Sequence, residues 1–464
     1  MNKLILLVSI FILLNTNFLE AKIKIKGSNN TSKNLDDYGG INFEEKLNSF
    51  NKNLSNDKKN KYYGWETNTN ITPIGSQEAK KGGMITILGD DEFPSTFRSI
   101  GKDSRSQVLS LLEGLQYETL LSYDYEKLEW SPRLATHWKI SSDSLTYWYR
   151  IDPKSLWADG KEINTEDIIA TFKLLIDDGH EDPNVSAFWK DSFETPIAES
   201  KYIIRVTAKK KDWRTFRYFS SGFSVMPSTY LNKVDGAGYI EKYDFSFMPG
   251  SGPYEYDKES SKKGNEGYIV LKKRTNWWAE NYIRNRGLYN FDKIKFIFIE
   301  DENQQVISFF NGDYDIYPWS RAQWWVERFT DEKYNEISKG WVQKVKIFNY
   351  LPKGPSGIVF NTKKAPFDNI NIRKALTYMF DVDKLNKRLF FNEYVRLNTY
   401  FFGTPYANPN NPLITFSPDL ALTLLKEEGW TRKKGEQWLT NDENEIFEFE
   451  FLIDPSGARI YTTF

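Results

Sequence analysis

Residues 357–391 restrict the fold more than any other stretch, because they join a short apolar strand to two helical patterns. The apolar run 358–360 predicts the strand. Asn369 can accept a free backbone N–H of a first helical turn, and apolar residues then recur at helical spacing. Asp381 can cap a second helix in the same way. The stretch therefore predicts a strand, a loop and two amphipathic helices, an arrangement that many folds contain.

The chain has 464 residues, too many for a single core, and this length predicts at least two lobes. Its formal net charge is -1, so no global positive field exists to attract nucleic acid or an anionic membrane. The chain has no cysteine, which excludes disulfides, thiolate metal sites and thiol catalysis. Its two histidines are His137 and His180, far apart in sequence, so we expect no histidine-rich metal site and no cofactor.

Residues 1–21 have the pattern of a cleavable secretory signal peptide. Lys3 supplies the positive start, and the apolar core 4–14 is too short to span a bilayer. An uncleaved N-terminal anchor is the alternative. Residues 22–80 are rich in Asn and Lys with few apolar runs, which is typical of a linker or of an arm that wraps a surface.

Alternating or continuous apolar runs predict further strands along the chain. The helices are indicated by caps: Asn164 begins one, Asp301 with Gln304 forms a capping box for another, and Ser417 precedes a third. The expected strands are Met84–Leu88, Leu145–Ile151, Tyr202–Val206, Tyr268–Lys272, Ile294–Ile299, Trp341–Phe348 and Phe447–Ile453, and a further helix is expected over Ser104–Leu115.

Several spaced strings resemble one family. They are the segment NTKKAPFDNINIRKALTYMFDVDKL from Asn361, the block around Trp157-Ala158-Asp159-Gly160, the turn GSGPY from Gly250, and SPDLALTLLKEEGW from Ser417. Together they resemble the family 5 extracellular solute-binding proteins, the peptide-capturing subunits of ABC importers. Within that family the chain looks most like the YejA-like branch.

The resemblance implies an α/β fold, a two-lobed clamshell of the type II periplasmic binding proteins with a discontinuous lobe I. It implies lobe I over residues 81–345, with a sub-lobe at about 112–205, and lobe II over 346–464. In the family, more of lobe II follows the last expected strand. We therefore expect the sequence to be truncated and lobe II to be incomplete.

The resemblance also suggests which side chains face the ligand cleft. Arg321 could hold a carboxylate through its planar fork, although an ion pair within the lobe is at least as good an interpretation. The three tryptophans near it could equally be ordinary packing. The candidate ligand-binding residues are Phe93, Thr96, Ser251, Gly252, Trp319, Arg321, Trp324, Trp325 and Asn361.

The resemblance implies a periplasmic receptor that captures oligopeptides or peptide-like solutes, closes on the ligand without altering it and delivers it to an inner-membrane permease. We expect a monomer and no enzymatic activity. The glycines at 236 and 238 do not form a dinucleotide-binding motif, because residue 241 is Glu241. Abundant carboxylates leave a secreted carbohydrate-active enzyme or glycan-binding protein as the alternative.

Overall fold

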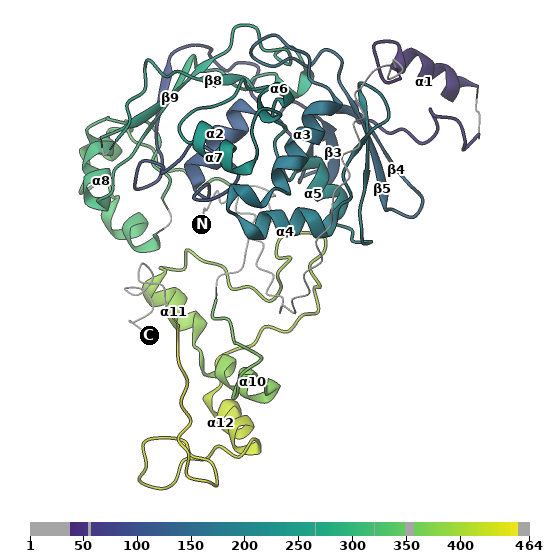
Figure 1. The fold of residues 1–464 in the computed structure, drawn as a ribbon. Helices are drawn as coiled ribbons and strands as arrows, with labels where there is room; N and C mark the ends of the chain where they lie inside the picture. Colours follow the sequence, from purple (N-terminus) through teal and green to yellow (C-terminus); the bar gives the residue numbers. More distant parts are fainter. Residues whose placement is uncertain (1–37, 54–56, 265, 320, 349–356, 453–464) are drawn as a thin grey trace. The chain divides into compact units, whose positions relative to one another are not determined.

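The computed structural model describes residues 38–53, 57–264, 266–319, 321–348 and 357–452 (Figure 1). The expected signal peptide lies outside these residues. The chain divides into two compact units, an N-terminal unit that ends at Pro318 and a C-terminal unit that begins at Trp319. The expected lobe boundary at 345/346 stays a prediction. Within the described residues, no helix is long and apolar enough to cross a membrane.

The first layer of the N-terminal unit is a four-stranded sheet in the order β1-β10-β9-β8. Strand β1 pairs with β10 in parallel, and the other two pairs are antiparallel. The helix α2 packs its apolar face on this sheet, in a core that includes Leu112, Leu271 and Phe296. The bounds are β1 Met84–Leu88, α2 Gln107–Gln116, β8 Tyr254–Tyr256, β9 Tyr268–Lys273 and β10 Lys293–Ile297.

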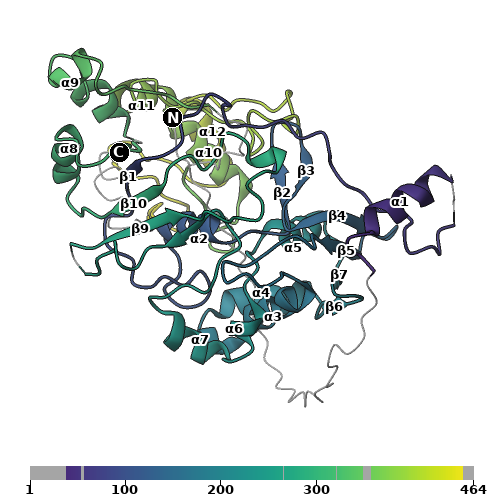
Figure 2. The same ribbon diagram turned by 90° about the horizontal axis from the view of Figure 1, so that it is seen from above.

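A second, antiparallel sheet of the same unit has the order β4-β5-β7-β6 (Figure 2). Its helices bury the largest core of the molecule, which includes Tyr149, Phe172 and Phe219. The strands are β2 Leu121–Asp124 and β3 Glu129–Pro132, which form a separate hairpin, and β4 Ala135–Ile140, β5 Thr146–Ile151, β6 Ile197–Ala198 and β7 Ile203–Thr207. The helices are α3 Thr165–Leu175, η1 Asp178–His180, α4 Pro183–Ser192, α5 Thr215–Ser221, α6 Ser228–Leu231, α7 Gly236–Tyr243, η2 Ile283–Asn285 and α8 Glu302–Phe310.

Hydrogen bonds confirm the predicted caps Asn164 and Asp301. Ser417 precedes α12 (Pro418–Glu427) but makes no capping side-chain bond. The helix expected from Ser104 begins at Gln107 and is capped by Ser106.

Asn164 caps α3, and Asp167 completes a capping box by accepting the Asn164 backbone N–H at 2.9 Å. Asp167 is buried, which raises the pKa of its carboxyl group. The box predicted for α8 is only half formed: Asp301 accepts from the Gln304 backbone at 2.8 Å, but the Gln304 side chain turns to Ser308. The reason is that an amide side chain one turn into a helix can bond forward as easily as back.

We call the described part of the Asn/Lys-rich segment, between residues 38 and 80, the arm. Its first part, as far as Thr67, packs on the second sheet, and Gly75 lies against Gly287. The first part contains the helix α1, Phe43–Lys52, which buries Phe43 and Leu47 against Ile203. Arg150 of β5 lies beneath the arm and donates to the backbone carbonyl of Gly39 at 2.8 Å. Apolar contact and backbone hydrogen bonds therefore hold the arm in place.

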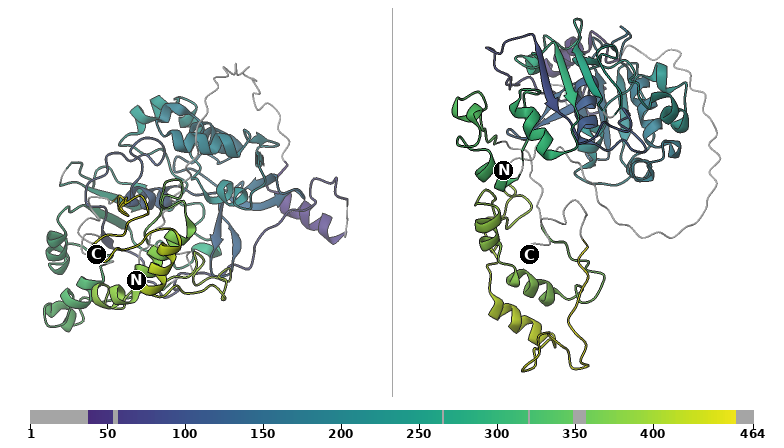
Figure 3. Two further views of the ribbon diagram at one scale, coloured as in Figure 1. Left: turned by 90° about the horizontal axis from the view of Figure 1, so that it is seen from below. Right: turned by 90° about the vertical axis from the view of Figure 1, so that its left-hand side faces the viewer.

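In the described residues of the C-terminal unit the named elements are helices, and loops make up most of the rest. Helices α10 and α12 lie side by side around a small core of Ile372, Ala375, Ala421 and Leu425 (Figure 3). Asn369 and Asp381 cap α10 and α11 as predicted. The bounds are η3 Trp324–Arg328, α9 Asn335–Ser338, α10 Ile370–Met379, α11 Val382–Leu389 and α12 Pro418–Glu427.

Three strand predictions in this unit are wrong for the residues described. The segments 341–348, 358–360 and 447–452 contain no strand, and Ile453 lies outside the described residues. Most of their apolar side chains are exposed, with Val359 at 92% and Leu452 at 93%, although Phe447 is half-buried against the core of α10 and α12. Alternating apolar and polar residues can give a strand one apolar and one polar face, but a strand forms only when a neighbouring strand completes its backbone hydrogen bonds. These segments have no such neighbour in the described part of the chain.

Candidate functional site

Four of the candidate residues gather in the C-terminal unit. The indole rings of Trp319 and Trp324 stack with centroids 4.7 Å apart and an interplanar angle of 13°. Phe329 is buried and meets Trp319 edge-on at 5.3 Å. The Trp319 indole N–H donates to the Arg321 carbonyl at 2.9 Å, which ties the loop to the stack. Both tryptophans remain half-buried, so their rings offer area to a ligand.

Cations lie over these rings. The guanidinium carbon of Arg328 is 3.9 Å from the Trp324 ring centroid, and that of Arg321 is 5.6 Å from it. The Lys344 ammonium lies 4.5 Å from the Trp325 ring. Each such contact contributes about 0.5–1 kcal/mol at an exposed position. The cluster therefore combines flat apolar faces with positive charge.

The backbone explains why the side chains converge. Residues 324–328 form a single turn of π-helix, in which the Phe329 N–H reaches the Trp324 carbonyl at 2.8 Å. The wider turn leaves carbonyl groups available, and Lys344 donates to those of Trp325 at 2.5 Å and Phe329 at 2.8 Å. Burial lowers the pKa of Lys344. Single π-turns of this kind often occur at functional sites.

Lys344, Lys346 and Arg328 were missed by the sequence reasoning. A signal was present, since Lys344 and Lys346 are two residues apart and share one face of an extended segment. Lys346 also forms an ion pair with Glu393 at 2.5 Å. Nothing in the sequence, however, indicates that this segment returns to the tryptophans.

Other candidates lie inside the N-terminal unit and are already bonded there. Thr96 is fully buried, donates to the Asp244 carbonyl at 2.9 Å and accepts the Arg98 backbone N–H at 3.1 Å. Ser251 is also fully buried, and its hydroxyl accepts the Glu118 backbone N–H at 2.9 Å. These contacts favour a structural role for both residues in this structure.

Gly252 is required by close packing. A Cβ atom at this position would lie 2.5 Å from the Leu115 carbonyl oxygen at the end of α2. The GSGPY turn therefore fixes α2 against the start of β8. Phe93 is half-buried and packs on Phe298 with centroids 5.2 Å apart. Asn361 is exposed in the C-terminal unit, where its side chain accepts the Lys363 backbone N–H at 3.1 Å.

Among the described residues, no cluster of three or more His, Asp or Glu side chains could hold a metal ion. Buried His137 has its pKa lowered to about 4, first by burial and then by the charge of Arg150. It lies under the arm, away from the Trp319–Trp325 segment in sequence, and its ring packs on Phe43 at 5.4 Å.

Comparison with known proteins places these observations in a family. Residues 129–453 match the family described as bacterial extracellular solute-binding proteins, family 5 Middle. The chain is 25% identical over 423 residues to the probable peptide-binding protein YejA of Agrobacterium fabrum, with 82% of this chain and 66% of the relative covered. The chain spans no more than about two thirds of the length of the curated relatives it matches.

Solved structures show the same fold at low sequence identity. NikA from Brucella suis, in complex with Fe(III)-EDTA, is 18% identical with a TM-score of 0.61, covering 78% of this chain and 67% of that one. The oligopeptide-binding protein AppA from Bacillus subtilis, in complex with a nonapeptide, is 19% identical with a TM-score of 0.55, covering 80% and 68%. The predicted α/β periplasmic binding protein fold and the YejA-like resemblance are confirmed, and this chain belongs to the family 5 bacterial extracellular solute-binding proteins.

Proposed function

We propose that this chain is the periplasmic substrate-binding protein of an ABC importer, and that it captures peptides or peptide-like solutes and delivers them to an inner-membrane permease. The observation that carries the proposal is the family match over residues 129–453. A relative described as peptide-binding and a neighbour solved with a nonapeptide support peptide as the ligand class. The family consists of solute-binding proteins, so the proposed action is capture without chemistry.

The aromatic cluster supplies a physical basis for binding varied side chains. Trp319, Trp324 and Trp325 offer flat area without demanding one hydrogen-bond pattern. Arg328 and Lys344 place positive charge over those rings, which favours ligands that carry a carboxylate. We assign the ligand contact to this cluster.

A binding experiment with one matched control tests both parts. Purified protein is titrated with peptides of two to nine residues, by calorimetry, together with the variants Trp324→Ala and Trp213→Ala. Trp213 is the control, because it lies on the surface of the N-terminal unit and is 81% exposed. We expect saturable binding that Trp324→Ala weakens at least tenfold, about 1.4 kcal/mol, while Trp213→Ala leaves it unchanged.

The outcomes separate function from site. If no peptide binds and native mass spectrometry finds a different co-purifying solute, such as a glycan, the peptide assignment is wrong. If peptides bind equally well to Trp324→Ala, the function stands and the cluster is not the site. Secretion through residues 1–21 and the monomeric state belong to the same proposal, and N-terminal sequencing of the exported protein and light scattering test them.

A further inference from the structure

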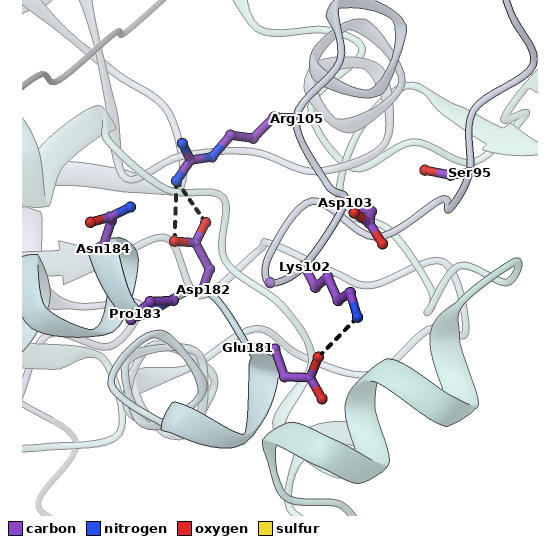
Figure 4. A pocket seen from close by; sticks show the side chains of 9 residues that line it. Ser95, Lys102, Asp103, Arg105, Glu181, Asp182, Pro183 and Asn184 are labelled. Carbon is purple, nitrogen blue, oxygen red and sulfur yellow. Dashed lines mark hydrogen bonds and ion pairs between the residues drawn. The ribbon is translucent and has the colours of Figure 1, made fainter.

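Opposite charges pair with one another around the recess that residues 101–105 and 181–184 line on the N-terminal unit (Figure 4). Arg105 lies 2.8 Å from Asp182, and Lys102 lies 3.4 Å from Glu181. Three of these four side chains are more than half exposed, so water screens their charges further. The group of residues beneath the arm is different, because it holds two basic side chains together and away from water.

His137 of β4 and Arg150 of β5 are direct neighbours across the second sheet, and both side chains are buried. The Thr136 hydroxyl joins them: its oxygen accepts from Arg150 Nη1 at 2.8 Å and lies 3.0 Å from His137 Nδ1. Because the guanidinium already donates to this oxygen, the Thr136 O–H is available to donate to Nδ1 of a neutral imidazole. A proton on Nδ1 would reverse that bond and bring a second positive charge to the same hydroxyl.

The arm covers this pair of side chains. The ring centroid of Phe43, on α1, lies 5.4 Å from the His137 ring centroid and 5.2 Å from the Arg150 guanidinium carbon. The carbonyls of Gly39 and Gly40 accept from Arg150 at 2.8 and 3.0 Å. The arm is therefore held by the same guanidinium that a protonated His137 would repel, and it also keeps water away from both groups.

The other charges near His137 do not offset this repulsion. Asp152 favours a charged imidazole, but the effects of burial and of Arg150 are larger, and together they lower the pKa of His137 to about 4. Burial raises the pKa of the Tyr38 and Tyr282 hydroxyls, so both stay neutral in acid. The charged side chains of the segments packed around His137 are Arg150 and Asp152 at the end of β5, Glu44 on α1 and Lys61 in the arm.

We propose that the α1 part of the arm is an acid-released strap: protonation of His137 places two like charges beneath Phe43, and α1 detaches so that both charges reach water. The backbone bonds between Glu66 and Trp138, at 2.8 and 3.0 Å, keep the rest of the arm tethered to β4. This switch lies wholly in the N-terminal unit and does not depend on the function proposed above.

Proton linkage sets the size of the effect. The pKa of His137 is about 4 with the arm in place, against an ordinary value of 6.5. If release restores the ordinary value, the ratio of released to docked α1 rises at most about 30-fold between about pH 7.5 and about pH 5. The docked form is fully stabilised above about pH 6.5 and loses that stabilisation as the pH falls toward 4.

A single introduced thiol reports the release, because the chain has no cysteine of its own. Leu47→Cys places the thiol on the buried face of α1, and Asn48→Cys, at the exposed next position, gives the reference rate at each pH. Both variants are labelled with a pyridyl disulfide, which reacts with thiols in acid as well as at neutral pH. Labelling through brief opening is proportional to the released fraction, so the ratio of the two rates measures release even while α1 is mostly docked.

We expect this ratio to rise between about fivefold and about 30-fold from about pH 7.5 to about pH 5, while circular dichroism shows that the remaining fold is intact. His137→Gln removes the titrating group and keeps a side chain that can accept from Thr136, so its ratio should stay constant. Glu44→Gln is the matched control. It removes the exposed carboxylate that reaches Arg150, and the rise should persist.

The proposal is overturned by a ratio that stays flat over this range, or by an equal rise in His137→Gln. A rise that Glu44→Gln abolishes also overturns it, because the acid response would then belong to the carboxylate. Amide hydrogen exchange over α1 in the unsubstituted chain, corrected for the intrinsic pH dependence of exchange, repeats the measurement without the introduced thiol. It decides the question if Leu47→Cys loosens α1 at every pH.

Discussion

Replacing Arg150 by methionine tests how the N-terminal arm is held. Arg150 is 3% exposed, and its guanidinium donates to the carbonyls of Gly39 at 2.8 Å and Gly40 at 3.0 Å, and to the Thr136 hydroxyl at 2.8 Å. A further bond reaches Glu44 at 3.2 Å, but that carboxylate is exposed and contributes little. Methionine fills part of the volume and offers no donor.

The contacts set the size of the effect. Three hydrogen bonds from a charged donor contribute about 1.5–3 kcal/mol each, or roughly 5–9 kcal/mol if the arm stayed in place. The α1 part of the arm can instead detach, while Glu66 stays bonded to the Trp138 backbone. Phe43 and Leu47 are the buried residues of α1, and each contributes about 1.5–3 kcal/mol before the ordering of the backbone is subtracted. Detachment limits the loss, and we expect the free energy of unfolding to fall by about 2–4 kcal/mol.

Urea denaturation gives the stability, and amide hydrogen exchange over α1 reports the arm directly. Arg214→Met is the control, because Arg214 pairs with Asp212 on the surface and its loss should cost less than about 0.5 kcal/mol. Rapid exchange in α1 with protected β5 and β7 would be the expected pattern for Arg150→Met. A stability loss below about 1 kcal/mol, with α1 still protected, would refute the reasoning.

Three further predictions follow from single residues. Burial lowers the pKa of His137 to about 4, below the value of about 6.5 in the unfolded chain. The stabilisation that comes from keeping His137 neutral is therefore complete above about pH 6.5 and is lost as the pH falls toward 4. The melting temperature of His137→Gln should depend less on pH in that window than the melting temperature of the unsubstituted protein. Gly252→Ala places a methyl group 2.5 Å from the Leu115 carbonyl oxygen and should lower the free energy of unfolding, measured in urea, by about 2–4 kcal/mol. Gly114→Ala is the control, because a Cβ at this position of α2 meets no other atom, and it should raise the same free energy by about 0.5–1 kcal/mol. Equal effects of the two substitutions would contradict the packing argument. Asn369→Ala removes the cap of α10 and should cost about 1 kcal/mol in the same assay, and an unchanged midpoint would show that the cap is dispensable.

Local structure in the N-terminal unit followed from the sequence because its signals are local. The strand Met84–Leu88 was predicted with its observed bounds, and the helix of Asn164 begins where its cap indicated. Periodicity and caps act within a few residues, so neighbours along the chain contain the necessary information. The family could be predicted for a similar reason. Short motifs such as GSGPY occur where the backbone packs so closely that only certain residues, here glycine, fit.

The candidate site could be predicted only in part. The sequence placed Trp319, Trp324 and Trp325 close together simply because they are close in the chain. It could not indicate that Lys344 folds back onto Trp325, or that the Ser251 hydroxyl accepts a hydrogen bond from the Glu118 backbone N–H inside the N-terminal unit. Burial and long-range contact depend on which surfaces meet, and composition does not specify that.

The sequence by itself determined the periodic elements, their caps and the family. Tertiary structure decided which alternating segments become strands, and residues 341–348 remain unpaired although their pattern resembles that of β1. It also decided that Arg105 forms an ion pair with Asp182, 2.8 Å away and far along the chain. The physical reason is the same in both cases: a hydrogen-bonded ladder or an ion pair between distant residues needs a second segment, and only the folded chain brings that segment into contact.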